Sequence, residues 1–369
     1  RCGGVGGVAR VPRTDGSGPL RSAILSLLSL LSGAPLLGAG CSHDVAHGCV
    51  VDDDCRSMAC DPGQLNVCLE NTGACGCKDD IPRGDVGRFS AMALRGPVAY
   101  VCAYNNDYGD LMLGHQNPGA VVDNWEFVDG MPEGGTPQNP ASQVRGGVTE
   151  AGDDVGRYCS IAITSGGDPV MSYHDDTHRS LKVATFGAIR WHTHIVDKAG
   201  GTNSTTGDTM GRWTSLTFDK SGAPGVAYYA EVAKGPSGKR ESQLRFAQAK
   251  RPDPQSAGDW NTTVVITRPL VQTDPKNPPP LPPGVALFVA SARKPDGSPV
   301  VAAYDGERGN LVFVEYDLGA RAWKVPEVLD GEDVMGRDTG DVGQFPALVM
   351  DTDGTAHLSY VDGSRRDLL

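Results

Sequence analysis

One pattern, centred on a glycine, occurs four times in this chain and a fifth time in a degenerate form. We call this glycine position zero; an aromatic residue follows at +2 and a tyrosine at +17. The intact copies are Gly87 with Phe89 and Tyr104, Gly156 with Tyr158 and Tyr173, Gly211 with Trp213 and Tyr228, and Gly343 with Phe345 and Tyr360. In the degenerate copy, Ala286, Phe288 and Ala303 occupy these places. The copies are on average 64 residues apart, (343 − 87)/4, so the chain is a repeat protein.

Each repeat is expected to contain four short strands. Apolar or aromatic residues alternate at +15 and +17, which indicates a strand with one buried face. The first strand follows position zero, as in 89–94, 158–163 and 213–218, and a turn with Asp and Gly, as in 219–224, leads to the second. A leucine opens the third strand, at Leu111, Leu181, Leu244, Leu311 and Leu368. A tryptophan marks the fourth, at Trp125, Trp191, Trp260 and Trp323.

These units predict an all-β fold, a β-propeller of four-stranded blades. About five blades are recognisable in residues 85–369; they start near residues 85, 154, 209, 284 and 341, and the last is truncated. The 49 glycines and 26 prolines suit short strands joined by turns. A tandem of β-sandwiches is the alternative. Because the first residue is Arg and the last repeat stops two residues into its third strand, we expect the natural chain to extend beyond both ends.

Residues 1–40 have the features of an export signal. Arg21 precedes an apolar run at 23–31, and small residues follow. A transmembrane helix is disfavoured because the run ends at 32–35, short of the roughly 20 residues that a span needs. The segment 36–41 resembles the lipobox of bacterial lipoproteins, which implies a lipid on Cys41, membrane anchoring and a place in the cell envelope or outer membrane. Leu37 lies one residue further from the cysteine than in that family, so secretion with Cys41 in a disulfide is the alternative.

Residues 41–80 form a cysteine-rich module with few large apolar residues, so we expect disulfides to hold it together. Its six further cysteines are Cys49, Cys55, Cys60, Cys68, Cys75 and Cys77. Their 15 pairings stay open, and bridges imply an oxidising compartment. No metal or other cofactor is predicted, because no pair of CxxC knuckles occurs. Cys102 and Cys159 are expected to be buried thiols, with a bridge between the first two repeats open if their Cα atoms lie within about 7 Å.

The net charge of −12 argues against a nucleic-acid partner. Residues 1–40 hold four arginines and one aspartate, so without them the charge is −12 − 3 = −15. Neutralising phosphates requires a basic surface.

Candidate ligand residues gather on one predicted face, which carries the connections between second and third strands and between successive blades. Long connections on one face favour binding. Around position zero the candidates are Asp85, Arg88, Asp154, Arg157, Arg212 and Asp341. Because Asp and Arg recur at one place in several blades, we interpret them as braces between blades, with ligand contact as the alternative. Blade 2 adds the unrepeated His174, Asp175 and His178 in a connection and His192 and His194 on a strand, and the histidines are expected to be solvated.

The Asp-x-x-Gly turns at 219–222 and 351–354 resemble the aspartate box of sialidase-like propellers. The Ser before the Asp and the Trp after the Gly are missing, and Ile81-Pro82-Arg83 reverses the order of the sialidase Arg-Ile-Pro segment. No catalytic residue is predicted, since no GxSxG elbow, HExxH motif or phosphate loop occurs. The hypothesis is an exported, lipid-anchored surface propeller that binds a glycan or a protein. The alternatives are a sialidase-like glycoside hydrolase and a structural envelope protein.

Overall fold

The structure is a computed structural model. It describes residues 49–50, 52–55, 57–58, 64–69, 73–79, 84–116, 124–132, 151–187, 190–199, 207–235, 237–270, 281, 283–332 and 338–369. The predicted export signal, Cys41, Cys60 and the side chain of Cys77 lie outside the described residues. In the described residues, no helix has the length and apolar character needed to cross a bilayer.

The described part of the cysteine-rich module is a small antiparallel hairpin. It contains a 3-10 turn, η1 (Asp52–Cys55), and the strands β1 (Gln64–Leu69) and β2 (Ala74–Asp79). Two disulfides, Cys49–Cys68 and Cys55–Cys75, hold it together. Disulfides therefore stabilise this segment, which is too short to form a sufficient hydrophobic core.

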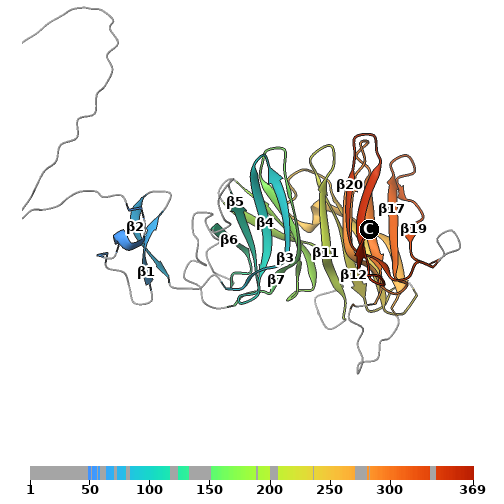
Figure 1. The fold of residues 1–369 in the computed structure, drawn as a ribbon, viewed down its shortest axis with the longest axis horizontal. Helices are drawn as coiled ribbons and strands as arrows, with labels where there is room; N and C mark the ends of the chain where they lie inside the picture. The colour runs from blue at the N-terminus through green and yellow to red at the C-terminus, as the bar shows by residue number, and fades with distance from the viewer. Residues whose placement is uncertain are drawn as a thin grey trace, which may run out of the picture. The chain divides into compact units, whose positions relative to one another are not determined.

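The repeats form five antiparallel sheets, which confirms the predicted propeller (Figure 1). Blade 1 contains β3 (Val86–Arg95), β4 (Val98–Asn105), β5 (Asp110–Gln116) and β6 (Asn124–Asp129). Blade 2 contains β7 (Val155–Ile163), β8 (Pro169–Asp175), β9 (Ser180–Phe186) and β10 (Trp191–Lys198). Blade 3 contains β11 (Thr209–Phe218), β12 (Pro224–Val232), β13 (Glu241–Ala249) and β14 (Trp260–Pro269). Blade 4 contains β15 (Val285–Arg293), β16 (Pro299–Asp305), β17 (Asn310–Asp317) and a divided fourth strand, β18 (Ala322–Trp323) and β19 (Glu327–Asp330). Blade 5 contains β20 (Val342–Met350), β21 (Ala356–Asp362) and β22 (Asp367–Leu368).

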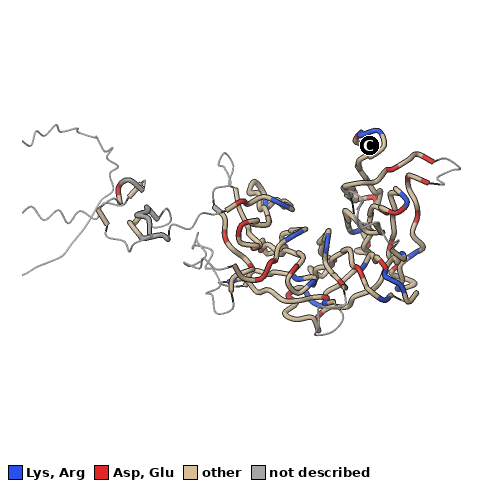
Figure 2. Tube along the Cα trace, turned by 90° about the horizontal axis from the view of Figure 1, so that it is seen from below, with Lys and Arg blue, Asp and Glu red and all other residues tan. Residues whose placement is uncertain are grey.

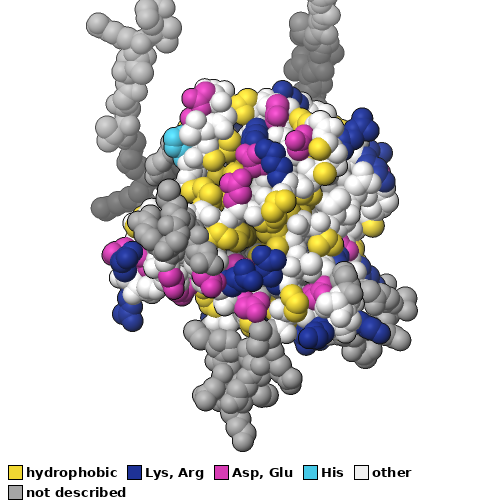
Figure 3. Space-filling view, turned by 90° about the vertical axis from the view of Figure 1, so that its right-hand side faces the viewer, with side chains coloured by type: hydrophobic (Ala, Val, Ile, Leu, Met, Phe, Trp, Pro, Cys, Tyr) yellow, Lys and Arg dark blue, Asp and Glu magenta, His cyan; other side chains and the backbone are white. Residues whose placement is uncertain are grey.

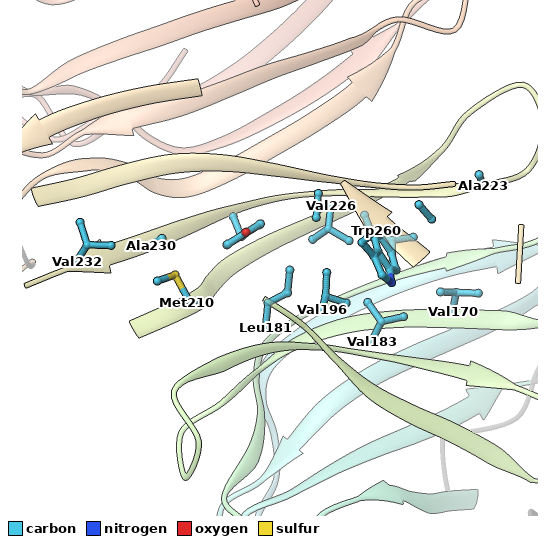
Figure 4. Close-up of a cluster of buried hydrophobic side chains, with 14 residues drawn as sticks. Val170, Leu181, Val183, Val196, Met210, Ala223, Val226, Ala230, Val232 and Trp260 are labelled. Carbon is cyan, nitrogen blue, oxygen red and sulfur yellow. The ribbon is translucent and has the colours of Figure 1, made fainter. Parts of the chain in front are cut away.

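The hydrophobic core lies between neighbouring blades. The first strands β3, β7, β11, β15 and β20 lie side by side in chain order (Figures 1 and 2). Between blades 2 and 3, Leu181 and Val183 of one sheet pack with Met210, Val226 and Trp260 of the next (Figure 4). Similar clusters fill the other three junctions. The apolar faces predicted for the second strands are therefore buried between neighbouring sheets.

Position zero is where each first strand bulges twice. The pairing register shifts between −1 and +1 and again between +1 and +4 in all five blades. The backbone φ at position zero is positive in every copy, including +75° at Ala286. At Gly156, Gly211 and Gly343, a Cβ atom would lie 2.7 Å from the Cα of a leucine in the preceding blade, Leu111, Leu181 or Leu311. Glycine is therefore required there by both the backbone angle and the close approach.

A second set of contacts links the blades through tyrosines. The hydroxyls of Tyr173, Tyr228 and Tyr360 donate to aspartates at the end of the preceding blade's fourth strand, at 2.7, 2.6 and 2.7 Å. These aspartates are Asp129, Asp197 and Asp330. The tyrosine at +17 is thus an interblade contact. Sequence patterns had indicated only that it lies on a buried face.

The alignment of Tyr104 with these tyrosines is wrong by one residue. In blade 1, Leu94 pairs with Ala99, whereas in blade 2 the equivalent Ile163 pairs with Pro169, so the first hairpin is one residue shorter. Arg88 accordingly pairs with Tyr104, as Arg157 pairs with His174. The residues equivalent to Tyr104 are therefore those at +18: His174, Tyr229, Tyr304 and Val361.

Two further expectations are corrected, and two more features of the blades follow. Cys102 and Cys159 form a disulfide between blades 1 and 2, with a Cα–Cα distance of 6.4 Å, instead of staying thiols. Leu244 lies three residues inside β13. The face opposite the long connections carries more than tight turns, because residues 250–259 form a loop with the 3-10 turn η3 (Ala257–Asp259). The indoles of Trp191 and Trp260 are on outer strands but are buried between blades, 7% and 5% exposed.

The first strands of the first and last blades expose apolar side chains. They are Phe89, Met92 and Leu94 of β3 and Phe345 and Val349 of β20. Figure 3 shows apolar side chains gathered on the side where the C-terminal strands lie.

Candidate ligand-binding site between blades 2 and 3

Five aromatic side chains form a continuous row across the first strands. They are the +2 residues Phe89, Tyr158, Trp213, Phe288 and Phe345, and successive ring centroids are 4.6, 4.9, 5.7 and 4.0 Å apart. All five have φ between +48° and +56°, a left-handed conformation that is uncommon for bulky residues. The double bulge therefore turns one aromatic side chain of every blade into this row.

Two junctions carry what we call a tyrosine clamp, formed by the residues at −2 and +1 and the +18-equivalent tyrosine of the preceding blade. At the junction of blades 1 and 2, the Tyr104 hydroxyl donates to Asp154 Oδ1 at 2.9 Å. Arg157 donates to Asp154 Oδ2 at 2.8 Å and to the Tyr104 hydroxyl at 3.2 Å. At the junction of blades 4 and 5, Tyr304 donates to Asp341 Oδ1 at 2.6 Å and Gln344 donates to Asp341 Oδ2 at 3.0 Å.

The clamp holds its tyrosine in the protonated state. Burial raises the pKa of both Tyr104 and Tyr304 above its ordinary value, and the neighbouring aspartate raises it further. A phenol that keeps its proton is a hydrogen-bond donor, and the carboxylate accepts that bond. The contacts of Asp154, Arg157 and Asp341 are those of interblade braces.

The junction of blades 2 and 3 departs from this arrangement at two of the three positions. Thr209 stands where the clamp aspartate would be, and His174 stands where the tyrosine would be. His174 is fully buried on β8, so the expectation that it is solvated in a connection is wrong. Its Nδ1 lies 2.7 Å from the carbonyl oxygen of Met210, so Nδ1 carries the proton and donates.

The other nitrogen of His174 faces Asp176. The Nε2–Oδ1 distance is 3.4 Å, and Nε2 is buried without a hydrogen-bond partner in the described chain. The contact with His174, together with the charges of Arg157 and Arg212, lowers the pKa of Asp176 to about 2. Asp176 is therefore ionised at neutral pH and lies near the two guanidinium groups.

Arg212 is the clamp residue that has lost its partners. Its Nε is buried and has no hydrogen-bond acceptor, which is also true of Arg157, but unlike Arg157 its guanidinium forms no ion pair within the described residues. Its charge lowers the pKa of Asp176 and opposes the rise in the pKa of Tyr158, a member of the aromatic row, so it acts electrostatically on both groups at this junction. A guanidinium with free donors matches the planar, bidentate geometry of a carboxylate.

The remaining candidates lie elsewhere on the same face. Arg88 and Asp85 form an exposed pair at 3.5 Å, with side chains 60% and 55% exposed. His178 donates its backbone N–H to Asp175 Oδ1 at 2.8 Å, and its Nδ1 lies 3.0 Å from Asp175 Oδ2. Arg365 makes the same backbone contact to Asp362 in blade 5, also at 2.8 Å.

Asp153, Asp175 and His178 lie close enough together to hold a metal ion. Because the equivalent turn in blade 5 uses an arginine for the same contact, we interpret the His178–Asp175 pair as turn support. The prediction of solvated histidines also fails at His194. Trp260 Nε1 donates to its Nε2 at 3.0 Å, and burial lowers the pKa of His194 to about 4.

The sequence indicates in part that the junction of blades 2 and 3 lacks the tyrosine clamp. Thr209 replaces the aspartate found at Asp85, Asp154 and Asp341, whereas Arg212 is kept. The loss of the tyrosine at His174 was concealed by the short first hairpin, which shifts Tyr104 by one position.

Comparisons with known proteins find a likeness of fold only. No family model and no curated protein matches the sequence. An α-L-arabinanase of Penicillium chrysogenum, solved with arabinobiose, is 12% identical over 83% of this chain and 83% of its own, with a TM-score of 0.45. The GH93 α-L-arabinofuranosidase of Fusarium graminearum, also with arabinobiose, is 12% identical over 81% and 79%, with a TM-score of 0.43. A thermostable family-43 glycoside hydrolase is 11% identical over 76% and 85%, with a TM-score of 0.39. At these values the likeness carries no statement about ligand or activity.

Proposed function

We propose that this protein binds acidic glycans between blades 2 and 3, with Arg212 as the residue that contacts a sugar carboxylate. The observation that carries the proposal is the dismantled clamp. Arg212 keeps the position of a bracing arginine, but the aspartate and tyrosine that would occupy its donors are replaced by Thr209 and His174. A half-buried guanidinium with an unsatisfied N–H favours an oxygen acceptor from outside the chain.

The aromatic row supports a sugar as the ligand. Tyr158 and Trp213, 4.9 Å apart between ring centroids, lie at the same junction as Arg212 and are only partly buried. Ligand sites combine apolar and aromatic surface with a few placed polar groups, which is the composition of this junction. The apolar faces of pyranose rings pack on such rings while Arg212 binds the carboxylate.

Binding is favoured over hydrolysis by the protonation states. Glycoside hydrolysis requires a carboxylic acid that keeps a proton to donate to the leaving group. The carboxyl group of Asp176 at this junction has a lowered pKa. Among the described carboxyl groups, a raised pKa is resolved only for Glu126, which is not on the face that carries Arg212.

Export and a lipid on Cys41 belong to the same proposal. A lipid-anchored propeller in the cell envelope would present its long connections to external glycans. The disulfides Cys49–Cys68, Cys55–Cys75 and Cys102–Cys159 support an oxidising location.

A glycan array that pairs each uronate- or sialate-bearing oligosaccharide with its neutral counterpart tests the proposal. We expect signals confined to the acidic members and lost in Arg212→Ala. Equal signals for both members of the pairs would reject the role of the carboxylate. Turnover of chromogenic glycosides would instead support the sialidase-like hydrolase, and no glycan signal would favour a protein ligand or a structural envelope protein.

A further inference from the structure

A cavity lies between blades 1 and 2, beside the turn that joins β7 to β8, whereas Arg212 lies near the start of β11. Its volume is about 240 Å³. Its walls come from Tyr100 of β4, Leu113 of β5, Glu126 of β6, Phe186 of β9 and Trp191 of β10. Arg95, His115 and residues 167–169 complete the lining. The volume is smaller than the roughly 300–1,000 Å³ of sites for drug-sized molecules, so it suits a single chemical group.

Glu126 is the acidic group of this cavity whose carboxyl oxygen is buried. Its Oε2 atom makes no hydrogen bond of normal geometry among the described residues, and the indole N–H of Trp191 lies close enough to lower the pKa of Glu126 and so to offset part of the effect of burial. Arg95 forms no ion pair with Glu126 among the described residues and has no effect on its pKa; its guanidinium donates to the carbonyl oxygens of Gly167 at 3.1 Å and Gly166 at 3.5 Å. Burial raises the pKa of Glu126 to about 7. A buried carboxyl group without a counter-charge is costly unless a cation joins it.

Three aromatic rings share the cavity with this carboxyl group. Phe186 and Trp191 meet edge to face with centroids 5.1 Å apart, and Tyr100 contributes a third ring. The faces of aromatic rings carry partial negative charge and attract cations, and cages of such rings bind quaternary ammonium groups. Asp168 adds a further acidic side chain at the edge.

We propose that this cavity binds an organic ammonium group, with Glu126 as its counter-ion and Tyr100, Phe186 and Trp191 as its aromatic walls. The site is separate from the glycan site and does not depend on it. An ammonium ligand supplies the positive charge that the buried carboxylate lacks, and its alkyl substituents pack on the rings. An anionic or neutral ligand would leave Glu126 without a counter-charge.

Titration calorimetry with choline and with its neutral isostere 3,3-dimethylbutan-1-ol tests the proposal on the full chain. We expect choline to bind at least tenfold more tightly than the alcohol at pH 8. The affinity for choline should fall about tenfold between pH 8 and pH 6, because Glu126 becomes protonated over this range and the cation loses its counter-ion. Glu126→Gln should lower the affinity at least tenfold and remove this pH dependence, whereas Glu327→Gln, on an exposed strand residue, should change neither.

Equal affinities for choline and the alcohol would overturn the proposal, as would undetectable choline binding at pH 8. Unchanged binding in Glu126→Gln would also overturn it. If that variant does not fold, the proposal is tested by the unmodified protein alone, through its relative affinities for choline and the alcohol and the pH dependence of choline binding. Phe186→Leu then gives a second variant, expected to weaken choline more than the alcohol, because it removes a ring and keeps apolar volume.

Discussion

Replacing the two arginines of successive blades with alanine should separate a brace from a ligand contact. Arg157 is paired with Asp154 at 2.8 Å, hydrogen-bonded to Tyr104, and its guanidinium lies 5.1 Å from the centre of that tyrosine ring. Arg212 has no such contacts in the described chain. Both arginines are at position +1 and are partly buried, so each substitution is the matched control of the other.

The expected cost of Arg157→Ala follows from the exposure of the pair. Breaking a buried ion pair costs about 3–5 kcal/mol, and an exposed pair contributes below about 1 kcal/mol. The side chains of Arg157 and Asp154 are 33% and 36% exposed, so solvent screens part of the interaction. We therefore expect a loss of about 1–2 kcal/mol, which lowers the melting temperature of a domain of this size by roughly 2–4 °C. Arg212→Ala should change stability by less than about 0.5 kcal/mol.

Thermal unfolding of the two variants, followed by circular dichroism at equal ionic strength, checks these values. A loss in Arg212→Ala equal to that in Arg157→Ala would refute the reasoning, since Arg212 would then be a brace as well. The difference between the variants should shrink at high salt, because the Arg157 pair is only half-buried.

Three further predictions concern the scaffold. The double variant Cys102→Ala and Cys159→Ala should lose about 3–4 kcal/mol in thermal unfolding, because the disulfide joins residues 57 positions apart in two blades; no loss would mean that the bridge does not form. In denaturant unfolding, Gly211→Ala should lower the free energy of unfolding by several kcal/mol, because its Cβ would lie 2.7 Å from the backbone of Leu181. Ala286→Gly should raise it by about 1 kcal/mol, because it relieves a φ of +75°. A stabilising Gly211→Ala or a destabilising Ala286→Gly would contradict this argument. The pKa of Glu126 is about 7 in the folded protein and near 4.5 in the unfolded chain. The free energy of unfolding should therefore decline by up to about 3 kcal/mol as the pH rises from 4.5 to 7. The variant Glu126→Gln should lack this decline when unfolding is measured over the same pH range.

The repeat pattern predicted the fold because its residues carry geometric requirements. Gly156 and Gly211 are needed where two backbones approach, and Tyr158 and Trp213 follow the bulge that this approach imposes. Even the degenerate Ala286 adopts the left-handed angle of the copies with glycine. A fixed spacing of such residues therefore specified both the strand that starts each blade and the number of recognisable blades.

The site between blades 2 and 3 was harder to predict from the sequence, because it is defined by the absence of the clamp aspartate and tyrosine. The first hairpin of blade 1 is one residue shorter than that of blade 2, so the sequence repeats align Tyr104 with Tyr173 instead of His174. The replacement of the clamp tyrosine by His174 therefore could not be recognised from the sequence. The hydroxyl contacts that turn Asp154 into a brace join residues 50 positions apart, and no local pattern reports them. The cavity at Glu126 depends in the same way on packing between two blades.

The most direct test of the proposed function is the affinity for one acidic oligosaccharide and its carboxyl methyl ester, measured by titration calorimetry with the unmodified protein, Arg212→Ala and Arg157→Ala. We predict that the acid binds at least tenfold more tightly than the ester to the unmodified protein and to Arg157→Ala, and that Arg212→Ala binds both equally weakly. A preference for the acid that survives in folded Arg212→Ala would contradict the proposal.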